Sequence, residues 1–375
     1  MAEPGRHLFI LAGEPSGDRI AADLVRRLRD RLPLRLSGVG GEALRAEGLV
    51  SLFPMADLAV MGWSDVIARL PLLLWRVRQT ARAILAARPD LVVLVDSQVF
   101  SALVARQVRS GGGSMPMLLY VAPSVWAWKP ERARALAPLF DAVLAVLPFE
   151  PAVMQKLGGP PTFYVGHPAL QQFDFRAEQP ARGPVLLLPG SRTGELRRHA
   201  RLLRDVATRL AGMPAIEAFV VPTPTHLLPA VEAETATWPV EVEVVSGEAE
   251  KRQAFRRAVA ACATTGTVTL ELALAGVPMV TTYVADKGQA KNFKAYAVRF
   301  AALPNIVADR LVVPEHLFTT PEPDVVGDDL ADLLVSPARI DAQRSAFAEI
   351  RALMETGTSE TPRSDPAEYV LALLR

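Results

Sequence analysis

The stretch Pro184–His199, PVLLLPGSRTGELRRH, combines a glycine, a hydroxyl and an arginine in consecutive positions. Residues 185–188 are apolar and suit a short buried strand, which a proline and a glycine break before a charged, helical segment. Gly190 lets the backbone approach a ligand, Ser191 can cap the helix, and the free N–H groups of the first turn attract anions. Arg192 adds a planar, charged fork that suits phosphate oxygens. The stretch indicates an anion site; the alternative is a capped helix with a solvated arginine.

A second loop of this kind follows the apolar run 258–263. Thr265, Gly266 and Thr267 place hydroxyls and a glycine at the expected start of a helix, where a phosphate is favoured. One turn inward, Glu271 is placed to accept hydrogen bonds from a ribose. Together the two loops are typical of a nucleotide site.

A carboxylate follows a third apolar run. Residues 90–96, DLVVLVD, predict a strand buried on both faces, with Asp96 at its carboxyl end. Ligands of open α/β sheets bind outside that end of the strands, although locally Asp96 or Ser97 is better interpreted as a helix cap. Two tryptophans and a lysine in the loop 122–129 indicate a surface that a ligand or a neighbouring domain fills.

Two further segments have open interpretations. Gly38–Ala43 matches the G-x-G-x-x-A dinucleotide fingerprint, but it follows the second expected strand and not the first. Leu58–Leu74 is apolar, leads into basic sequence, and contains Pro71, which we expect to break or kink it. Its tryptophans and arginines suit contact with lipid headgroups; the alternative is a core helix with a basic outer edge.

These segments alternate as strand, loop and helix, beginning with the strand His7–Ala12, which is typical of a doubly wound α/β fold. The 375 residues suit two domains of roughly 150 to 200 residues each. The polar, proline-bearing segment Gln171–Gly183 is the expected hinge. We therefore predict domains at 1–170 and 171–345, followed by a helical segment at 346–375.

Composition narrows the class of protein. Lysine plus arginine is 41 and aspartate plus glutamate 40, and this net charge of +1 argues against a protein built mainly to bind nucleic acid. The single cysteine, Cys262, excludes internal disulfides and multi-cysteine zinc clusters and fits a reducing compartment. We see no signal peptide and no run of about 18 apolar residues, so we expect a cytoplasmic protein without a spanning helix.

The common catalytic motifs are missing from the sequence. It has no G-x-x-x-x-G-K-[ST], H-E-x-x-H, Asp-x-Asp or G-x-S-x-G, so neither a P-loop nucleotidase, a catalytic metal nor the commonest serine hydrolase is indicated. A metal-free nucleotide-sugar enzyme or a dinucleotide enzyme remains.

Nine blocks, in order along nearly the whole chain, carry a specific resemblance. They are AGEPSGD (12–18), GVGGEALRAEG (38–48), LAVMGWSDVIARLP (58–71), APSVWAWKPERA (122–133), VLAVLPFE (143–150), YVGHP (164–168), LLPGSRTGE (187–195), TTGTVTLELALAGVPMV (264–280) and LPNIVADR (303–310). In this set the chain resembles the lipid-A-disaccharide synthases.

The resemblance implies a B-type glycosyltransferase: two Rossmann-like domains with parallel sheets facing a central cleft, and a C-terminal helix crossing back to the first domain. It implies transfer, with inversion, of 2,3-diacylglucosamine from UDP-2,3-diacylglucosamine to 2,3-diacylglucosamine 1-phosphate, releasing UDP. No metal or other cofactor is expected. The implied partners are the two substrates and the phospholipid surface on the inner face of a Gram-negative inner membrane; a homodimer is one expected state.

The resemblance also implies roles for residues. Asp96 matches the general base, Asn305 a polar active-site residue, and Arg192 a group that stabilises the leaving pyrophosphate. The residues implied to bind the UDP-sugar are Gly190, Ser191, Arg192, Thr265, Gly266, Thr267 and Glu271. Those implied for the acceptor side are Glu14, Ser16, Gly17, Ser124 and Trp126. Those implied to contact the membrane and acyl chains are Trp63, Arg69, Leu72, Leu73, Trp75 and Arg76.

The chain departs from the family pattern just after Asp96. Where the family typically reads Asp-Ala-Pro-Asp-Phe or Asp-Ser-Pro-Asp-Phe, this chain has Gln98 for the proline and Val99 for the second carboxylate. A paralogue that binds UDP-sugar but has a changed acceptor or no synthase activity is therefore an alternative. A UDP-sugar epimerase and an NAD-dependent enzyme that binds its cofactor at Gly38–Ala43 are weaker ones.

Overall fold

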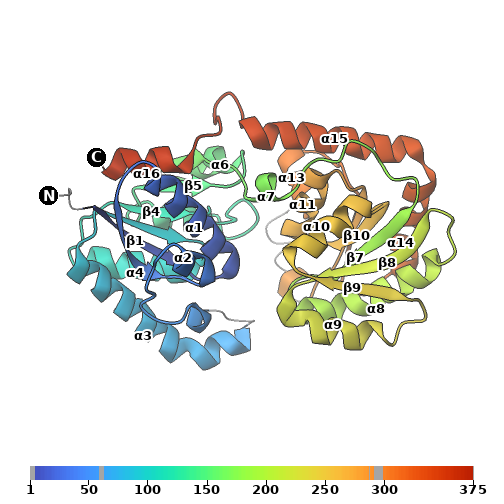
Figure 1. Ribbon diagram of the computed structural model, residues 1–375, viewed down its shortest axis with the longest axis horizontal. Helices are drawn as coiled ribbons and strands as arrows, with labels where there is room; N and C mark the ends of the chain where they lie inside the picture. Colours follow the sequence, from blue (N-terminus) through green and yellow to red (C-terminus); the bar gives the residue numbers. More distant parts are fainter. Residues whose placement is uncertain (1–4, 59–62, 287, 291–298, 375) are drawn as a thin grey trace. The chain divides into compact units, whose positions relative to one another are not determined.

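The computed structural model describes residues 5–58, 63–286, 288–290 and 299–374, without the side chains of 63–68. The chain forms two compact units (Figure 1). Unit 1 comprises residues 1–167 and 356–375, and unit 2 comprises residues 168–355. Each unit contains its own parallel six-stranded sheet.

The sheet of unit 1 has the order β2-β1-β3-β4-β5-β6. Its strands are β1 (Arg6–Ala12), β2 (Leu34–Val39), β3 (Leu91–Val95), β4 (Met117–Tyr120), β5 (Ala142–Ala145) and β6 (Thr162–Tyr164). The helices are α1 (Pro15–Arg29), α2 (Glu42–Ala46), α3 (Trp63–Ala87), α4 (Gln98–Ser110), α5 (Glu131–Leu136), α6 (Glu150–Lys156) and α16 (Pro366–Leu374), with a short 3-10 turn η1 (Met55–Leu58). All five residues of β3 are buried, as expected for a central parallel strand with helices on both faces.

The chain reverses its direction across this sheet between β1 and β3. From β1 it goes outward to β2, then crosses to β3 on the other side. The crevice at such a switch point, outside the carboxyl ends of the strands, is where open α/β sheets bind ligands. Gly13–Asp18, which spans the loop after β1 and the first turn of α1, and Asp96, which follows β3, both lie there.

Unit 2 repeats the plan with the order β12-β11-β10-β7-β8-β9. Its strands are β7 (Gly183–Leu188), β8 (Ile216–Thr223), β9 (Val242–Ser246), β10 (Ala260–Thr264), β11 (Met279–Val284) and β12 (Glu315–Phe318). The helices are α7 (Ala169–Gln172), α8 (Thr193–Leu210), α9 (Leu228–Thr235), α10 (Glu248–Arg257), α11 (Thr267–Ala275), α13 (Leu303–Ala308), α14 (Pro323–Val335) and α15 (Pro337–Thr356), with a 3-10 turn η2 (Thr225–Leu227). The switch point falls between β7 and β10, so the loops at 189–192 and 265–267 follow neighbouring strands.

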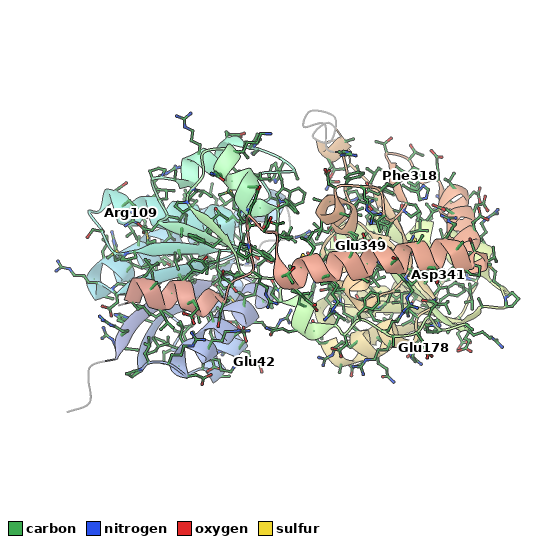
Figure 2. All side chains as sticks on the ribbon, turned by 90° about the horizontal axis from the view of Figure 1, so that it is seen from above. Glu42, Arg109, Glu178, Phe318, Asp341 and Glu349 are labelled. Carbon is green, nitrogen blue, oxygen red and sulfur yellow. The ribbon has the colours of Figure 1, made fainter. Side chains whose placement is uncertain are left out.

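Two helices close the fold. Figure 2 shows α15, which carries Asp341 and Glu349, running along unit 2. Its buried Gln343 exchanges two hydrogen bonds with the backbone of Met279, at 2.8 and 2.9 Å, and thereby fixes α15 to the start of β11. Helix α16 packs against α1 and β3 in unit 1.

Two helices contain prolines. Helix α3 continues through Pro71, which lies inside it, so the expected break at this proline is wrong. Leu303, Pro304 and Asn305 begin a short helix, α13. In α13 the proline occupies the first turn, where its missing N–H has no helical partner to lose.

Candidate active site

Asp96 stands at the carboxyl end of β3 in a strained backbone. Its φ is +54° and that of Ser97 is +43°, both in the left-handed region that non-glycine residues rarely adopt. The Asp96 N–H donates to the Tyr120 carbonyl at 2.8 Å, and the Ser101 hydroxyl donates to the Asp96 carbonyl at 2.8 Å. These bonds hold the turn, a combination of strain and support that is common at functional sites.

The Asp96 carboxyl is not a helix cap. Ser97 occupies the N-cap position of helix α4, as the local interpretation allowed, but its side chain forms no cap hydrogen bond. Burial raises the pKa of the Asp96 carboxyl, and a hydrogen bond from the Ser97 N–H opposes that rise. Within the part of the chain that the structure describes, no cation forms an ion pair with Asp96. A partly desolvated, unpaired carboxylate is a better proton acceptor than a solvated one.

The loop after β1 and the first turn of α1 bring two glycines against this turn. A Cβ at Gly13 would lie 1.9 Å from the Ser97 hydroxyl oxygen, so only glycine fits there. A Cβ at Gly17 would lie 3.5 Å from the Cβ of Asp96, which places Asp96 beside the first turn of α1. Glu14 is the N-cap residue of α1, and Ser16 is exposed in its first turn. Glu14, Ser16 and Gly17 thus share the edge on which Asp96 stands.

Asp18, in the first turn of α1, explains the dinucleotide-like sequence. Its carboxylate is 3% exposed and accepts the N–H groups of Gly41, Ala43 and Leu44 at 2.7, 2.8 and 3.4 Å. The backbone donors that a pyrophosphate would use are occupied by a buried negative charge. The NAD interpretation of Gly38–Ala43 is therefore wrong, because the glycines serve contacts inside unit 1.

A glutamate that sequence reasoning did not single out supports the aromatic loop. Glu150 is 3% exposed and accepts the N–H groups of Val146 and Leu147 at 3.1 and 3.0 Å, and the Trp126 indole lies 3.4 Å away. Burial raises its pKa to about 7. The carbonyl of Ser124 accepts the Ala127 N–H at 3.0 Å and shapes the same loop. The signal in the sequence was the acidic residue two positions after a proline at a strand end.

In unit 2 the turn after β7 is held by Glu195. Its carboxylate accepts the N–H groups of Ser191 and Arg192 at 2.8 and 3.2 Å and pairs with the Arg192 guanidinium at 3.1 Å. Arg192 is the N-cap residue of α8, so the expectation that Ser191 caps the helix is wrong. Gly190 has φ +109°, and a Cβ there would lie 2.4 Å from a Glu195 oxygen. The anion-binding donors exist as expected, and the chain's own carboxylate lies on them.

His199 fixes this turn from below. It is fully buried; its Nδ1 donates to the carbonyls of Glu195 and Pro189, at 2.8 and 3.2 Å, and its Nε2 accepts the Val284 N–H at 2.9 Å. These bonds require the neutral imidazole protonated on Nδ1. Burial lowers the pKa of His199 from its ordinary value. The histidine joins the loop after β7 to the end of β11.

The second predicted loop is open. Thr265 is half-buried, Gly266 and Thr267 are exposed at the start of α11, and a Cβ at Gly266 would meet nothing within 4 Å. Glu271 is half-buried and pairs with Lys251 at 2.5 Å. The structure therefore places the loops after β7 and β10 side by side at the switch point of unit 2.

Asn305 lies in α13, which packs against α11. Its side chain is fully buried; its Nδ2 donates to the Val313 carbonyl and to Glu315 at 2.9 and 2.7 Å, and its Oδ1 accepts the N–H groups of Val312 and Val313. All of its hydrogen-bonding capacity is used inside its own segment. This geometry makes Asn305 an organiser of residues 301–315 and leaves it no free group for a substrate.

Helix α3 presents a mixed surface. Leu70, Leu74 and Trp75 are exposed. Leu73 packs on the core of unit 1, and Arg76 pairs with Asp57 and lies over the rings of Phe53 and Trp75. Arg69 is exposed and Leu72 half-buried, while the side chain of Trp63 lies outside the described residues. Of the residues expected to contact lipid, Leu73 and Arg76 are thus engaged within unit 1.

Membrane-spanning helices and metal-binding clusters are both absent from the described residues. In these ranges no helix is both long and apolar enough to cross a bilayer. The same ranges contain no group of three or more His, Cys, Asp or Glu residues placed to hold a metal ion.

The architecture defines the class of protein. Two parallel α/β units with ligand-type loops at their switch points are the plan of B-type glycosyltransferases. The solved structure of the glycotransferase of kitacinnamycin has a TM-score of 0.61 at 19% identity, over 100% of both chains. The calicheamicin glycosyltransferase CalG4 has a TM-score of 0.57 at 18% identity, over 98% of both chains. The chain has the B-type glycosyltransferase fold.

The sequence identifies the family within that class. Residues 8–364 match the family model described as lipid-A-disaccharide synthetase. The lipid-A-disaccharide synthase of Rhodopseudomonas palustris is 43% identical over 99% of this chain and 97% of its own length, and that of Nitrobacter winogradskyi is 42% identical over 100% and 97%. The chain belongs to the lipid-A-disaccharide synthase family and is an enzyme of the glycosyltransferase class.

Proposed function

We propose that this enzyme transfers 2,3-diacylglucosamine from UDP-2,3-diacylglucosamine to the 6-hydroxyl of 2,3-diacylglucosamine 1-phosphate, with inversion at the anomeric carbon. Family membership over nearly the whole chain supports the reaction, and the state of Asp96 carries the mechanism. In the proposed step the Asp96 carboxylate removes the proton of the 6-hydroxyl, the hydroxyl oxygen forms the bond to the anomeric carbon, and the bond to UDP breaks.

In this proposal unit 2 binds the donor. The β-phosphate of UDP lies on the first turn of α8, with Arg192 beside it, and Glu195 withdraws from the Ser191 and Arg192 N–H groups as the phosphate arrives. Gly266 and Thr267 contribute further donors at the start of α11. Glu271 exchanges its Lys251 partner for the ribose hydroxyls. Arginine and two helix starts oppose the growing charge on UDP, so the proposed mechanism includes no metal or other cofactor.

Unit 1 binds the acceptor and the membrane. Glu14, Ser16, Gly17, Ser124 and Trp126 are proposed to surround the acceptor sugar, beside Asp96. Leu70, Leu74 and Trp75 of α3 are proposed to rest in the phospholipid interface, at the inner face of the inner membrane of a Gram-negative cell, with the exposed Arg78 and Arg82 near its headgroups. A homodimer is a proposed state that sedimentation would test.

The test is a mass-spectrometric assay with both acylated sugars in detergent, on the wild type and on Asp96→Asn. We expect the wild type to form tetraacyl disaccharide phosphate and the variant to lose about 10²- to 10⁴-fold in rate, the range for loss of a general base. UDP affinity, measured by calorimetry, stays unchanged because the donor residues lie in unit 2.

A pH profile sharpens the test. Because the pKa of Asp96 is raised, the rate of the wild type falls, as pH decreases, at a higher pH than for an ordinary carboxyl. A folded wild type that binds UDP and forms no disaccharide would contradict the proposal. That outcome favours the alternative, a paralogue in which Gln98 and Val99 accompany a changed acceptor.

A further inference from the structure

A groove lies in unit 1 between α4 and α5, next to the strand end that carries Asp96. Its volume is about 200 Å³. It starts at Gln98 and Val99, two and three residues after Asp96, and extends along α4 to Arg106. Seven residues of helix correspond to about 10 Å, so the groove is long enough for a segment of extended chain.

The floor of this groove is apolar. Ala102 and Leu103 of α4 face Leu136 and Leu139 across it. Leu136 and Leu139 are 7% and 6% exposed and belong to the core of unit 1, so the floor is a fixed surface and not a loose side-chain cluster. Val99 forms its mouth and is 61% exposed. The first turn of a helix favours an acidic residue, so an exposed valine there does not stabilise the helix. Its apolar side chain instead extends the apolar surface of the groove.

The rim of the groove is positive. Arg132 is the second residue of α5 and lies over the Trp128 ring at 4.5 Å, and Arg106 is exposed two turns along α4. No acidic residue lines the groove, and no carboxylate within the described ranges pairs with either arginine. By contrast Arg109, labelled in Figure 2 one turn beyond Arg106, is bound to Asp141 and to the Met115 carbonyl. Two free cations beside an apolar floor complement an anion that carries a hydrocarbon chain.

We propose that this groove binds one acyl chain of the phosphorylated acceptor, with the acceptor phosphate facing Arg132. The inference rests on the proposed function, since it assigns the acceptor of that same reaction to a particular surface. The chain lies on Ala102, Leu103, Leu136 and Leu139, and the aliphatic part of Arg106 covers it while its guanidinium stays in water. The sugar is thereby held next to Asp96, at the mouth that Val99 forms.

Arg132 gives the inference its sharpest test. Arg132→Gln removes the charge that faces the proposed phosphate and keeps a polar side chain of similar length. Arg134 is exposed on the same helix, α5, and does not line the groove, so Arg134→Gln is a matched control. Neither arginine belongs to the buried core of unit 1.

The experiment titrates the full chain with dodecyl phosphate below its aggregation concentration, by calorimetry. We expect binding that weakens about tenfold or more in Arg132→Gln and is unchanged in Arg134→Gln. Inorganic phosphate and dodecyltrimethylammonium bind weakly, since each lacks one half of the proposed ligand. In the synthase assay Arg132→Gln raises the KM for the acceptor and leaves UDP affinity unchanged.

Several outcomes overturn the inference. If inorganic phosphate binds as tightly as dodecyl phosphate, the arginines alone explain the binding. If dodecyltrimethylammonium binds as tightly, the binding is adsorption of detergent. Dodecyl phosphate binding that is unaffected by Arg132→Gln would mean that the ligand binds elsewhere, for example on α3. Failure of the synthase reaction is separate: a wild type that forms no disaccharide but shows the expected dodecyl phosphate pattern would refute the proposed reaction and keep the groove as an acyl-phosphate site.

Discussion

Each unit contains a carboxylate that binds backbone N–H groups near the start of a helix, and the two differ in access to solvent. In unit 1 Asp18 is 3% exposed and holds Gly41, Ala43 and Leu44. In unit 2 the Glu195 side chain is 15% exposed and holds Ser191 and Arg192, both of which are exposed residues. The same interaction is closed to solvent in unit 1 and accessible to solvent in unit 2.

The comparison separates architecture from ligand binding. A buried carboxylate that satisfies buried donors cannot leave without exposing them unpaired, so Asp18 is part of the fold. An accessible carboxylate can be replaced by another anion at small cost, because water and the incoming ligand satisfy every group. A glycine-rich turn at a strand end is therefore evidence of an anion site only when the donors of that turn remain accessible.

Among substitutions at the two carboxylates, we expect Asp18→Ala to have the largest effect on stability. Loss of the carboxylate leaves the Gly41 and Leu44 N–H groups buried without partners, at a cost of about 3 kcal/mol or more in the stability of unit 1. Hydrogen exchange of β2 and α2 in the full chain should accelerate strongly. Unchanged exchange in a folded Asp18→Ala protein would show that the sealed site is not structural.

Glu195→Ala should have a smaller effect with two opposite signs. Removal of the cap lowers the stability of unit 2 by about 1 kcal/mol. The phosphate of UDP then no longer has to displace the Glu195 carboxylate, and a gain of about 1 kcal/mol in binding free energy corresponds to UDP binding up to about fivefold tighter. Calorimetry with UDP measures the second effect, and Glu232→Ala, which removes an equal charge from α9, serves as control. Weaker UDP binding in Glu195→Ala would mean that Glu195 assists the phosphate and does not compete with it.

The smallest expected effect is the pH dependence of stability that His199 of unit 2 contributes. The folded-state pKa of His199 lies below 6.5, so the stability it contributes is complete above about pH 6.5 and is lost as pH falls below that value. The thermal unfolding temperature of unit 2 should therefore fall between pH 7 and pH 5, and it should fall less in His199→Gln. His7 of unit 1, whose pKa burial also lowers, contributes a slope of the same sign in both proteins. Identical slopes in the two proteins would exclude His199 as a source.

Much of the fold could be predicted from local pattern. The run before Asp96 is apolar at every position because β3 is buried on both faces, and the strand, loop and helix units after β1, β7 and β10 follow from glycine and hydroxyl positions. Sequence reasoning also placed Gly190, Arg192, Thr265 and Thr267 just after two strands, and these strands are neighbours in the sheet of unit 2. The roles of these residues in binding stay predictions.

The remaining features depend on contacts between distant segments. The strand orders, and hence the two switch points, arise from pairing that no local pattern records. Asp18 meets Gly41 across 23 residues of sequence, so the fingerprint at Gly38–Ala43 could not show that its donors were taken. Asn305 is a polar residue with every bond satisfied internally, and its motif alone does not distinguish that state from an exposed one.

Helix α16 follows unit 2 along the chain but is packed into unit 1. Its Val370, Leu371 and Leu374 are buried, and its Glu368 and the preceding Asp365 pair with Arg31 of unit 1. On the ribosome, unit 1 therefore cannot be completed when its own strands emerge, since residues 366–374 are made only after the whole of unit 2. The nascent first unit must wait with an apolar surface uncovered on α1 and β3, where a chaperone has time to act.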